Sequence, residues 1–409
     1  MRAMDSGQII CQQLPTARRT LRVAVVTETY PPEVNGVAMT ISRMVAGLQQ
    51  RQHQVQLIRP RQHHHDSPAN EHNFEEVLQR GVAIPRYDSL KMGLPAKQAL
   101  LRLWSTRRPD IVHIVTEGPL GWSALAAAGK LRIPCSSDFH TNFHAYSRHY
   151  GIGWLKKPIV AYLRKFHNKA DCTLVPTSAT REELEQHGYL NVRVVARGVD
   201  TKLFSPSRRS AALRRQWGVK PQQPVALYVG RLAPEKNLPL VLQTYAAMKA
   251  VSRDARLVLV GDGPARGALH AANPDLIFAG MRTGEDLAAH YASGDIFLFP
   301  SITETFGNVT IEAMASGLAV IAYNYAAAAE HIEHGRNGLV ADYDSAQDFI
   351  GLGVNLVNDP QRIADFGRRA RETTGRIDWE HVNDDFESAL LGLIAASDAA
   401  ADDEARLSA

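Results

Sequence analysis

The chain has 409 residues, more than one ordinary hydrophobic core holds, so we expect two domains. Apolar residues make up 45% of it and charged residues 22%, the balance of a soluble globular protein. No apolar run approaches the roughly 18 residues that a membrane-spanning helix needs, which argues against an integral membrane protein.

The first 20 residues lack the apolar segment of a signal peptide, and we expect them to form a disordered extension. The chain has three widely spaced cysteines, Cys11, Cys135 and Cys172. This odd number indicates a reducing compartment and offers no metal site. We therefore expect a cytoplasmic protein.

The net charge of +4 hides a difference between the two halves of the chain. Residues 1–200 contain 26 Lys and Arg and 16 Asp and Glu, a formal charge of +10. Residues 201–409 contain 20 Lys and Arg and 26 Asp and Glu, a formal charge of −6. The basic half favours an anionic partner, such as a lipid surface or a phosphorylated acceptor, although a contribution to solubility alone explains the same numbers.

Residues 21–200 alternate short β-branched runs with longer amphipathic stretches. The first run, "LRVAVVTE", has the pattern of a buried strand, and "GVAMTISRMVAGLQQR" has apolar residues at helical spacing. Further strands are predicted at residues 54–60, 111–116, 133–140 and 172–178, with a helix at 181–188. Strands that alternate with helices indicate parallel βαβ units.

The Gly, Asp, Ser and Pro residues of "RGVDTKLFSPS" mark a linker, after which the alternation starts again. Strands are predicted at residues 224–231, 255–264, 276–280, 295–301 and 318–324. We expect an amino-terminal domain over 21–200 and a carboxyl-terminal domain over 201–380. A last helix at about 380–396 is expected to pack on the first domain, before a loose tail at 397–409. The fold class is α/β, with two doubly wound domains and ligands at the carboxyl ends of the strands.

The loop "YVGRLAPEKN" follows the first strand of the second domain and carries Arg231 and Lys236. Two cations at a helix start can hold a diphosphate, the arginine through its planar fork and the lysine as a point charge. A solvated loop in which Glu235 pairs with Lys236 explains the same residues.

The stretch "ETFGNVTIE" places Glu304 before a helix start and Glu312 about one turn into the helix. The free N–H groups and dipole of a helix start suit a phosphate, and Gly307 lets a ligand approach the backbone. Glu312 can accept hydrogen bonds from ribose hydroxyls. The plain alternatives are a helix-end charge for Glu304 and a solvated position for Glu312.

The motifs "VGRLAPEKN", "VLVGDGP", the two glutamates seven residues apart and "HGRNGLV" follow one another in this order. Together they resemble the retaining glycosyltransferases of family 4, which have the GT-B fold of two Rossmann-like domains facing a cleft. The resemblance extends over nearly the whole chain from Leu21. It disfavours a GT-B-like nucleotide-sugar epimerase or phosphorylase and a non-catalytic sugar-nucleotide binder.

The resemblance implies a role for each candidate residue. Arg231 and Lys236 would bind the donor diphosphate, Glu304 the hydroxyls of the donor sugar and Glu312 the ribose. The backbone at Phe306, Gly307, Asn308 and Val309 would close on the sugar and the phosphate.

In the first domain, the resemblance places the glycine loop at Asn35–Gly36 beside the phosphates and the acceptor. This loop lacks the G-x-G-x-x-G of a dinucleotide fold, which disfavours an oxidoreductase. His140 matches the family's histidine near the reacting carbon of the donor, and a structural histidine is its alternative. We interpret His144 and His149 as structural, and the triplet His63–His64–His65 as a loop.

The subgroup is indicated by Arg197, where most of the family has asparagine, together with "FHTNF" and "PRYDSLKMGLP". In these positions the sequence resembles bacterial GDP-mannose-dependent α-mannosyltransferases and the sulfoquinovosyl- and glucosyl-diacylglycerol synthases. The expected substrates are a nucleotide-diphosphate sugar and a lipid or glycan acceptor. Residues 148–169 mix aromatic residues with cations, which fits either a segment on anionic lipid or a packed helix with solvated lysines.

The resemblance also implies the mechanism: transfer with retention by front-face attack, without a metal or other cofactor. The leaving diphosphate itself would take the acceptor proton. The protein would then position the substrates and stabilise charge on the leaving group. No carboxylate of the sequence stands out as a nucleophile, so double displacement is not favoured.

Overall fold

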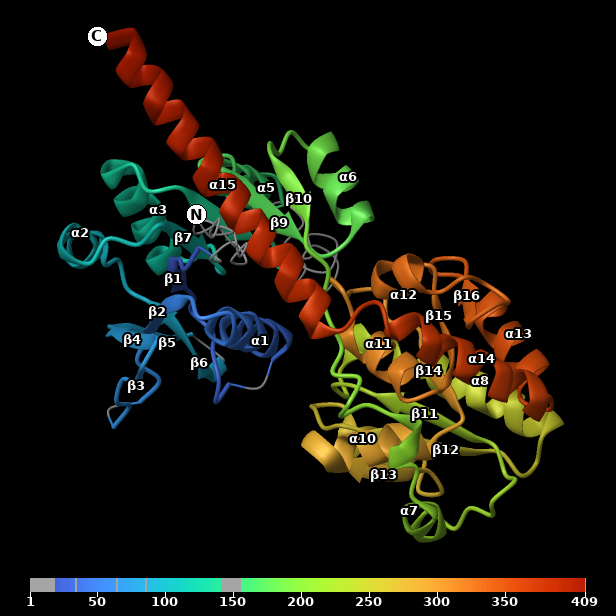
Figure 1. Cartoon of the computed structure of the whole chain (residues 1–409). Helices are drawn as coiled ribbons and strands as arrows, with labels where there is room; N and C mark the ends of the chain where they lie inside the picture. Colours follow the sequence, from blue (N-terminus) through green and yellow to red (C-terminus); the bar gives the residue numbers. More distant parts are fainter. Residues whose placement is uncertain (1–18, 34, 64, 85–86, 141–155, 409) are drawn as a thin grey trace, which may run out of the picture.

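The computed structural model describes residues 19–33, 35–63, 65–84, 87–140 and 156–408. It contains two separate parallel sheets, one in each half of the chain, as the alternating pattern predicts (Figure 1). The predicted disordered extension at residues 1–20 lies almost entirely outside the described residues.

The first sheet has eight strands in the order β10-β9-β8-β7-β1-β2-β4-β3. All of its pairings are parallel except that between β3 and β4. A separate two-stranded sheet joins β5 to β6. The strands are β1 (Arg22–Val26), β2 (Gln54–Pro60), β3 (Asn70–Glu71), β4 (Phe74–Gln79), β5 (Gly81–Ile84), β6 (Tyr87–Gly93), β7 (Ile111–Ile114), β8 (Cys135–Asp138), β9 (Cys172–Val175) and β10 (Val192–Val194).

The helices of this half are α1 (Gly36–Gln50), α2 (Lys97–Thr106), α3 (Pro119–Leu131), α5 (Lys156–His167) and α6 (Ser178–Gln186). Helix α1 begins where the Asn35 side chain accepts a hydrogen bond from the Ala38 N–H at 2.8 Å. Such a cap satisfies one of the free N–H groups of the first turn.

The second sheet has six parallel strands in the order β13-β12-β11-β14-β15-β16. Its strands are β11 (Val225–Val229), β12 (Arg256–Val260), β13 (Ile277–Gly280), β14 (Ile296–Phe299), β15 (Ala319–Tyr323) and β16 (Leu339–Ala341). Its helices are α7 (Ala211–Gln216), α8 (Leu238–Val251), α9 (Arg266–Ala272), α10 (Gly284–Ser293), α11 (Asn308–Ala315), α12 (Ala326–His331), α13 (Ala346–Leu356) and α14 (Pro360–Thr374). Short 3₁₀ turns lie at Pro206–Arg208 and Pro234–Lys236.

The last helix, α15 (Trp379–Ser408), returns to the first sheet, where Figure 1 shows it in red across the blue and green half. Its buried residues Phe386 and Leu390 share an apolar core with Val23 of β1 and Ile41 of α1. Oε1 of the buried Glu387 lies 2.9 Å from Nε2 of His53. This contact joins the helix to the turn before β2. The helix continues through residues 397–408, where the sequence suggested a loose tail.

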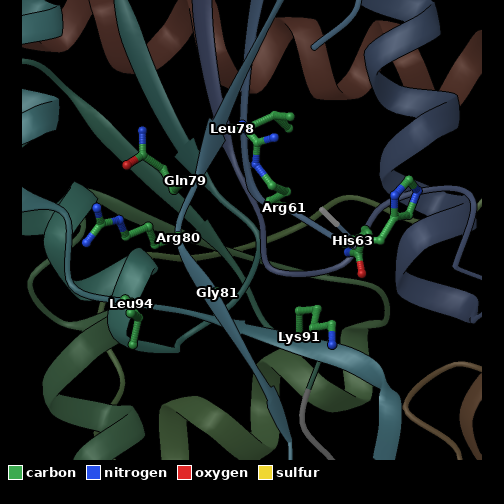
Figure 2. A pocket seen from close by; sticks show the side chains of 9 residues that line it. Arg61, His63, Leu78, Gln79, Arg80, Gly81, Lys91 and Leu94 are labelled. Carbon is green, nitrogen blue, oxygen red and sulfur yellow. The ribbon is translucent and has the colours of Figure 1, made fainter. Parts of the chain in front are cut away.

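A cavity of about 510 Å³ lies at the carboxyl ends of β2 and β4, and its lining includes Arg61, Arg80 and Lys91 (Figure 2). Within the described ranges, no helix is both long and apolar enough to cross a bilayer.

Candidate functional site

The loop that follows β11 carries the two predicted phosphate-binding cations, Arg231 and Lys236. Its start lies against the loop after β12, where Gly261 has a φ of +134°. A Cβ atom at Gly261 would lie 2.0 Å from the carbonyl oxygen of Gly230. Only glycine therefore allows this close approach, and the "VLVGDGP" motif fixes the position of the cation-bearing loop.

Both cations have carboxylate partners. Lys236 forms an ion pair with Glu304, which also accepts a hydrogen bond from the Ser301 hydroxyl at 2.6 Å. Arg231 Nη1 lies 3.5 Å from Glu235 Oε1. Glu235 thus faces Arg231, whereas the solvated-loop alternative paired it with Lys236. The Lys236 side chain is 19% exposed and that of Arg231 54%, so the arginine is the more accessible of the two cations.

Helix α11 starts at Asn308, directly after Gly307, whose φ of +87° favours glycine. The cap residue, Gly307, has no side chain that could bond this start, and the N–H groups of Asn308 and Val309 belong to the first turn, which has no partners within the helix. Phe306 is buried, and its carbonyl accepts a hydrogen bond from the Ala327 N–H at 2.8 Å. The turn is therefore fixed by packing, and among the described residues no recorded partner occupies the N–H groups of Asn308 and Val309.

Glu312 lies in the middle of α11, half-buried. The hydroxyl of Tyr291, from α10, donates a hydrogen bond to its Oε2 at 2.8 Å. Burial raises the pKa of the Glu312 carboxyl to about 7, although the bond from Tyr291 acts in the opposite direction. Glu312 therefore does not lie on a fully solvated surface, and burial disfavours its ionised form.

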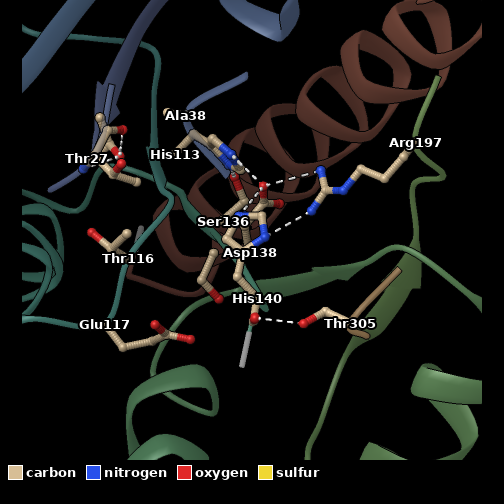
Figure 3. A network of polar contacts seen from close by, with 12 residues as sticks. Thr27, Ala38, His113, Thr116, Glu117, Ser136, Asp138, His140, Arg197 and Thr305 are labelled. Atoms are coloured by element: carbon tan, nitrogen blue, oxygen red, sulfur yellow. Dashed lines mark hydrogen bonds and ion pairs between the residues drawn. The ribbon is translucent and has the colours of Figure 1, made fainter. Parts of the chain in front are cut away.

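His140 belongs to a buried polar network at the end of β8, which Figure 3 shows around the carboxylate of Asp138. Asp138 Oδ2 lies 3.2 Å from His140 Nε2, 3.7 Å from His113 Nε2 and 3.8 Å from Arg197 Nη1. Arg197 Nη2 donates to His140 Nδ1 at 3.0 Å. The hydroxyl of Thr305 donates to the His140 carbonyl at 2.9 Å, so this network joins the first domain to the loop after β14.

The network fixes the protonation of His140. Burial lowers the pKa of its imidazole, and the Arg197 charge acts in the same direction, whereas Asp138 opposes both. Because a guanidinium can only donate, Nδ1 of His140 must be the acceptor and Nε2 carries the proton toward Asp138. Nδ1 is therefore occupied by Arg197, whereas Nε2 lies close to Asp138 Oδ2 without a well-aligned hydrogen bond.

The other predicted residue of the first domain, Gly36, is the first residue of α1, and a Cβ atom there would meet open space. Nearby, Glu28 follows β1 and accepts a hydrogen bond from the Leu120 N–H at 3.2 Å, at the start of α3. Burial raises the pKa of Glu28 to about 7, against the effect of backbone hydrogen bonds from Leu120 and Gly93. Glu28 was not among the residues that the sequence singled out.

The structure brings Lys236, Glu304 and Gly307 together at the ends of β11 and β14, and Thr305 connects this group to His140. The recorded partner of Glu312 is Tyr291, and that of Arg231 is Glu235. Among the described residues, no recorded contact joins Gly36 to this group. Asp138 and His113 were also missed. A buried strand that ends in Asp138, two residues before His140, was the available signal for Asp138.

The remaining predictions concern histidines, metal ligands and cysteines. His144 and His149 lie outside the described residues, as does His64 of the histidine triplet. In the part of the chain that the structure describes, no group of three or more His, Cys, Asp or Glu is arranged to hold a metal ion. Cys135 and Cys172 are buried and free.

Comparison with protein families matches both halves of the chain. Residues 34–203 match "Glycosyltransferase Family 4", and residues 223–359 match "Glycosyl transferases group 1". The two matches therefore cover the second sheet and all strands of the first sheet except β1.

Curated relatives match over nearly the full length. A GDP-mannose-dependent alpha-mannosyltransferase of Mycobacterium tuberculosis is 36% identical, over 90% of this chain and 95% of the relative. That of Corynebacterium glutamicum is 34% identical, over 88% of this chain and 86% of the relative. A sulfoquinovosyl transferase of Arabidopsis thaliana is 30% identical over 77% of this chain, which spans 63% of that protein.

Solved structures show the same fold. Sucrose-phosphate synthase from Thermosynechococcus elongatus superposes with a TM-score of 0.72 at 20% identity, over 92% of this chain and 100% of that one. HepE of Anabaena superposes with a TM-score of 0.71 at 18% identity, over 91% of this chain and 100% of HepE. The two family matches, the relatives above 30% identity and the shared GT-B fold agree with one another. This chain belongs to the group 1 glycosyltransferases of family 4.

Proposed function

We propose that this protein transfers a mannosyl group from GDP-mannose to a lipid or glycan acceptor and forms an α-glycosidic bond with retention. The observation that carries this proposal is the 36% identity, over nine tenths of the chain, to a GDP-mannose-dependent alpha-mannosyltransferase. A UDP-sugar-dependent glycosyl-diacylglycerol synthase is the second candidate. It is favoured by an alpha-monoglucosyldiacylglycerol synthase of Streptococcus pneumoniae, 27% identical over 74% of this chain.

In this proposal, the donor diphosphate lies between the cation-bearing loop and the start of α11. Arg231 and Lys236 contact its oxygens, and the N–H groups at Gly307–Asn308 add donors without charge. Lys236 would contact both the diphosphate and Glu304, because its ion pair with Glu304 already holds the two side chains side by side. Glu304 is then positioned to accept hydrogen bonds from the sugar hydroxyls.

The proposed mechanism is metal-independent front-face attack through an oxocarbenium-like state. As the glycosidic C–O bond breaks, negative charge develops on the diphosphate, and Arg231 and Lys236 stabilise it. The acceptor hydroxyl attacks from the same face and passes its proton to the leaving diphosphate. His140 contributes by position, since its carbonyl orients the Thr305 loop that carries Glu304.

A panel of nucleotides and nucleotide sugars, with thermal shift as the readout, tests the proposed donor. A ligand that binds only the folded protein raises its melting temperature with concentration. We expect GDP and GDP-mannose to give larger shifts than UDP and UDP-glucose. The reverse order would favour the diacylglycerol synthase, and no shift with any of them would contradict the proposed function.

The substitution Glu312→Gln should weaken GDP binding by about 1–3 kcal/mol, the contribution of hydrogen bonds to a charged acceptor. Ribose hydroxyls prefer the ionised carboxylate, whose pKa is about 7 in the free protein. Wild-type affinity should therefore increase as the pH rises through about 7. GDP also titrates, so the informative quantity is the difference between wild type and variant, measured by calorimetry at several pH values. If the difference in GDP affinity between wild type and variant is absent, or does not change with pH, Glu312 does not bind the ribose.

Helix α5 forms most of the described part of the cationic segment at residues 148–169. It buries Leu163 and Phe166 and exposes Lys157, Lys165 and, at 45%, Tyr162. The helix thus packs on its domain and also presents cations with an aromatic ring to the surroundings. Each lysine near an anionic membrane contributes about 1 kcal/mol, screened beyond a Debye length of about 8 Å.

We expect the protein to bind vesicles that contain anionic lipid and to detach as the salt concentration rises. Charge reversal at Lys156, Lys157 and Lys165 should abolish this binding and leave donor hydrolysis unchanged. Charge reversal at Lys130, Lys220 and Lys249 gives the same change in net charge elsewhere and should preserve binding. Equal, weak flotation with anionic and neutral vesicles would instead indicate a soluble glycan acceptor.

A further inference from the structure

The buried arginine of the His140 network begins the segment that connects the two domains. Arg197 follows β10, and its side chain is only 5% exposed. Before it, the Val195 N–H donates to the Val175 carbonyl at 2.9 Å. After it, Gly198 lies so close to Trp379 that a Cβ atom at Gly198 would lie within 3.0 Å of both the indole ring and the backbone. The backbone that carries Arg197 is therefore fixed on both sides.

The guanidinium of Arg197 holds the His140 ring in a defined orientation. Figure 3 shows the side chain reaching both Asp138 and His140. Nη2 donates to His140 Nδ1 at 3.0 Å, and Nη1 lies 3.8 Å from Asp138 Oδ2. Because the guanidinium is planar and rigid, these two contacts set the direction of the imidazole relative to the carboxylate.

The ionisable groups around His140 and its carboxylate partner come from three neighbouring segments. They are Asp138 of β8, His113 of β7 with Glu117 just after that strand, and Arg197 after β10. Among the described residues of the second domain, the recorded contact with His140 is the uncharged hydroxyl of Thr305. A proton on Nδ1 would remove the acceptor of the Arg197 hydrogen bond and place two cations in contact. The arginine therefore opposes the imidazolium by both geometry and charge.

We propose that Arg197 is a positioning residue for the transfer reaction, which holds His140 as a neutral ring with its proton on Nε2. The inference rests on the proposed glycosyl transfer, in which the His140 carbonyl orients the loop of Thr305 and Glu304. The oxocarbenium-like state is itself positive, so an imidazolium beside this loop would raise its energy. Arg197 keeps that second positive charge away from His140 while Asp138 balances its own.

Nitrogen NMR of the full chain with isotope-labelled histidine shows the state of the ring directly, with His140→Asn to identify the signal. In the wild type, we expect the proton on Nε2 and none on Nδ1 between about pH 6 and pH 8. In Arg197→Gln, His140 should take up a second proton within this range. The glutamine amide carries no charge and can also accept from Nδ1–H, whereas Asp138 and Glu117 both favour the imidazolium.

A matched control and a kinetic readout separate this role from a structural one. Arg193→Gln removes the same charge from an exposed position of β10 and should titrate as the wild type. With saturating donor, the ratio of kcat in Arg197→Gln to wild-type kcat should fall by about tenfold for each pH unit below the pKa of His140 in that variant. GDP affinity should stay unchanged, because the proposed nucleotide contacts belong to the second domain. A merely structural role would lower the rate by the same factor at every pH.

The wild-type spectrum decides the proposal even if the variant does not fold. A proton on Nδ1, or an imidazolium at neutral pH, would overturn it. A folded Arg197→Gln variant, checked by its melting temperature, that keeps a neutral His140 and a constant ratio of kcat would overturn it as well. Absence of turnover by the wild type with every nucleotide sugar of the panel would contradict the proposed function instead, and the state of the ring would still be read from the spectrum.

Discussion

The substitution Lys236→Ala should lower turnover by about 10²–10³-fold or more and leave the protein folded. The reason is that Lys236 would stabilise the charge that develops on the leaving diphosphate, and removal of one such donor has an effect of this size. Lys236 also forms an ion pair with Glu304. Initial rates of GDP release, measured beside the far-UV spectrum and the melting temperature, give the result.

A matched control separates the site from general charge effects. Lys249 lies on the exposed side of α8, 5.7 Å from the centre of the Tyr245 ring. Lys249→Ala removes the same charge from the same domain and should keep the wild-type rate. A folded Lys236→Ala variant with a near-normal rate would exclude Lys236 from the stabilisation of the leaving group.

The second large effect concerns stability: Asp138→Asn should destabilise the protein by about 3–5 kcal/mol, the range for breaking a buried ion pair. Burial alone would raise the pKa of the Asp138 carboxyl, but His113 and His140 together lower it well below its usual value. The variant would leave Arg197, whose side chain is 5% exposed, without an anion. A clear fall in the urea denaturation midpoint is the expected observation.

Two comparisons make this test specific. In Asp138→Asn/Arg197→Asn the unpaired cation is gone, so the double variant should lose less stability than Asp138→Asn alone. In the wild type, the ionised carboxylate contributes stability above the unfolded-state pKa of 3.8, and this is lost as the pH falls below that value. An unchanged midpoint in Asp138→Asn would show that Arg197 does not depend on this carboxylate.

The fold could be predicted where each strand is a short, fully buried, β-branched run. Strand β11 is of this kind, as is β1 after its exposed first residue, Arg22, and alternation with helices indicated two parallel sheets. The region of β3 to β6 was not assigned, because β4 is largely polar and half-buried and β6 contains Asp, Ser, Lys and Gly. The end of α15 was interpreted as loose from its charge. Its Ala, Glu and Arg residues have high helix propensity, and no Gly or Pro stops the helix.

The candidate site was predictable where the signal is local. The cations of the β11 loop and the glutamates around α11 are each encoded within about ten residues. The pairing of Lys236 with Glu304 was not predictable in this way, since it spans 68 residues and depends on the neighbouring positions of β11 and β14. The same holds for Arg197, which the sequence marked only as a subgroup feature and which reaches His140 across 57 residues.

The most direct test of the account is proton NMR of the first product formed from GDP-mannose by the wild-type protein with EDTA present. Transfer to water is the simplest version of the reaction, and the anomeric proton reports the stereochemistry before mutarotation. The account predicts release of GDP at a rate that EDTA does not change, with α-mannose as the first product. β-Mannose as the first product, or no release of GDP with any lipid or glycan acceptor, would contradict it.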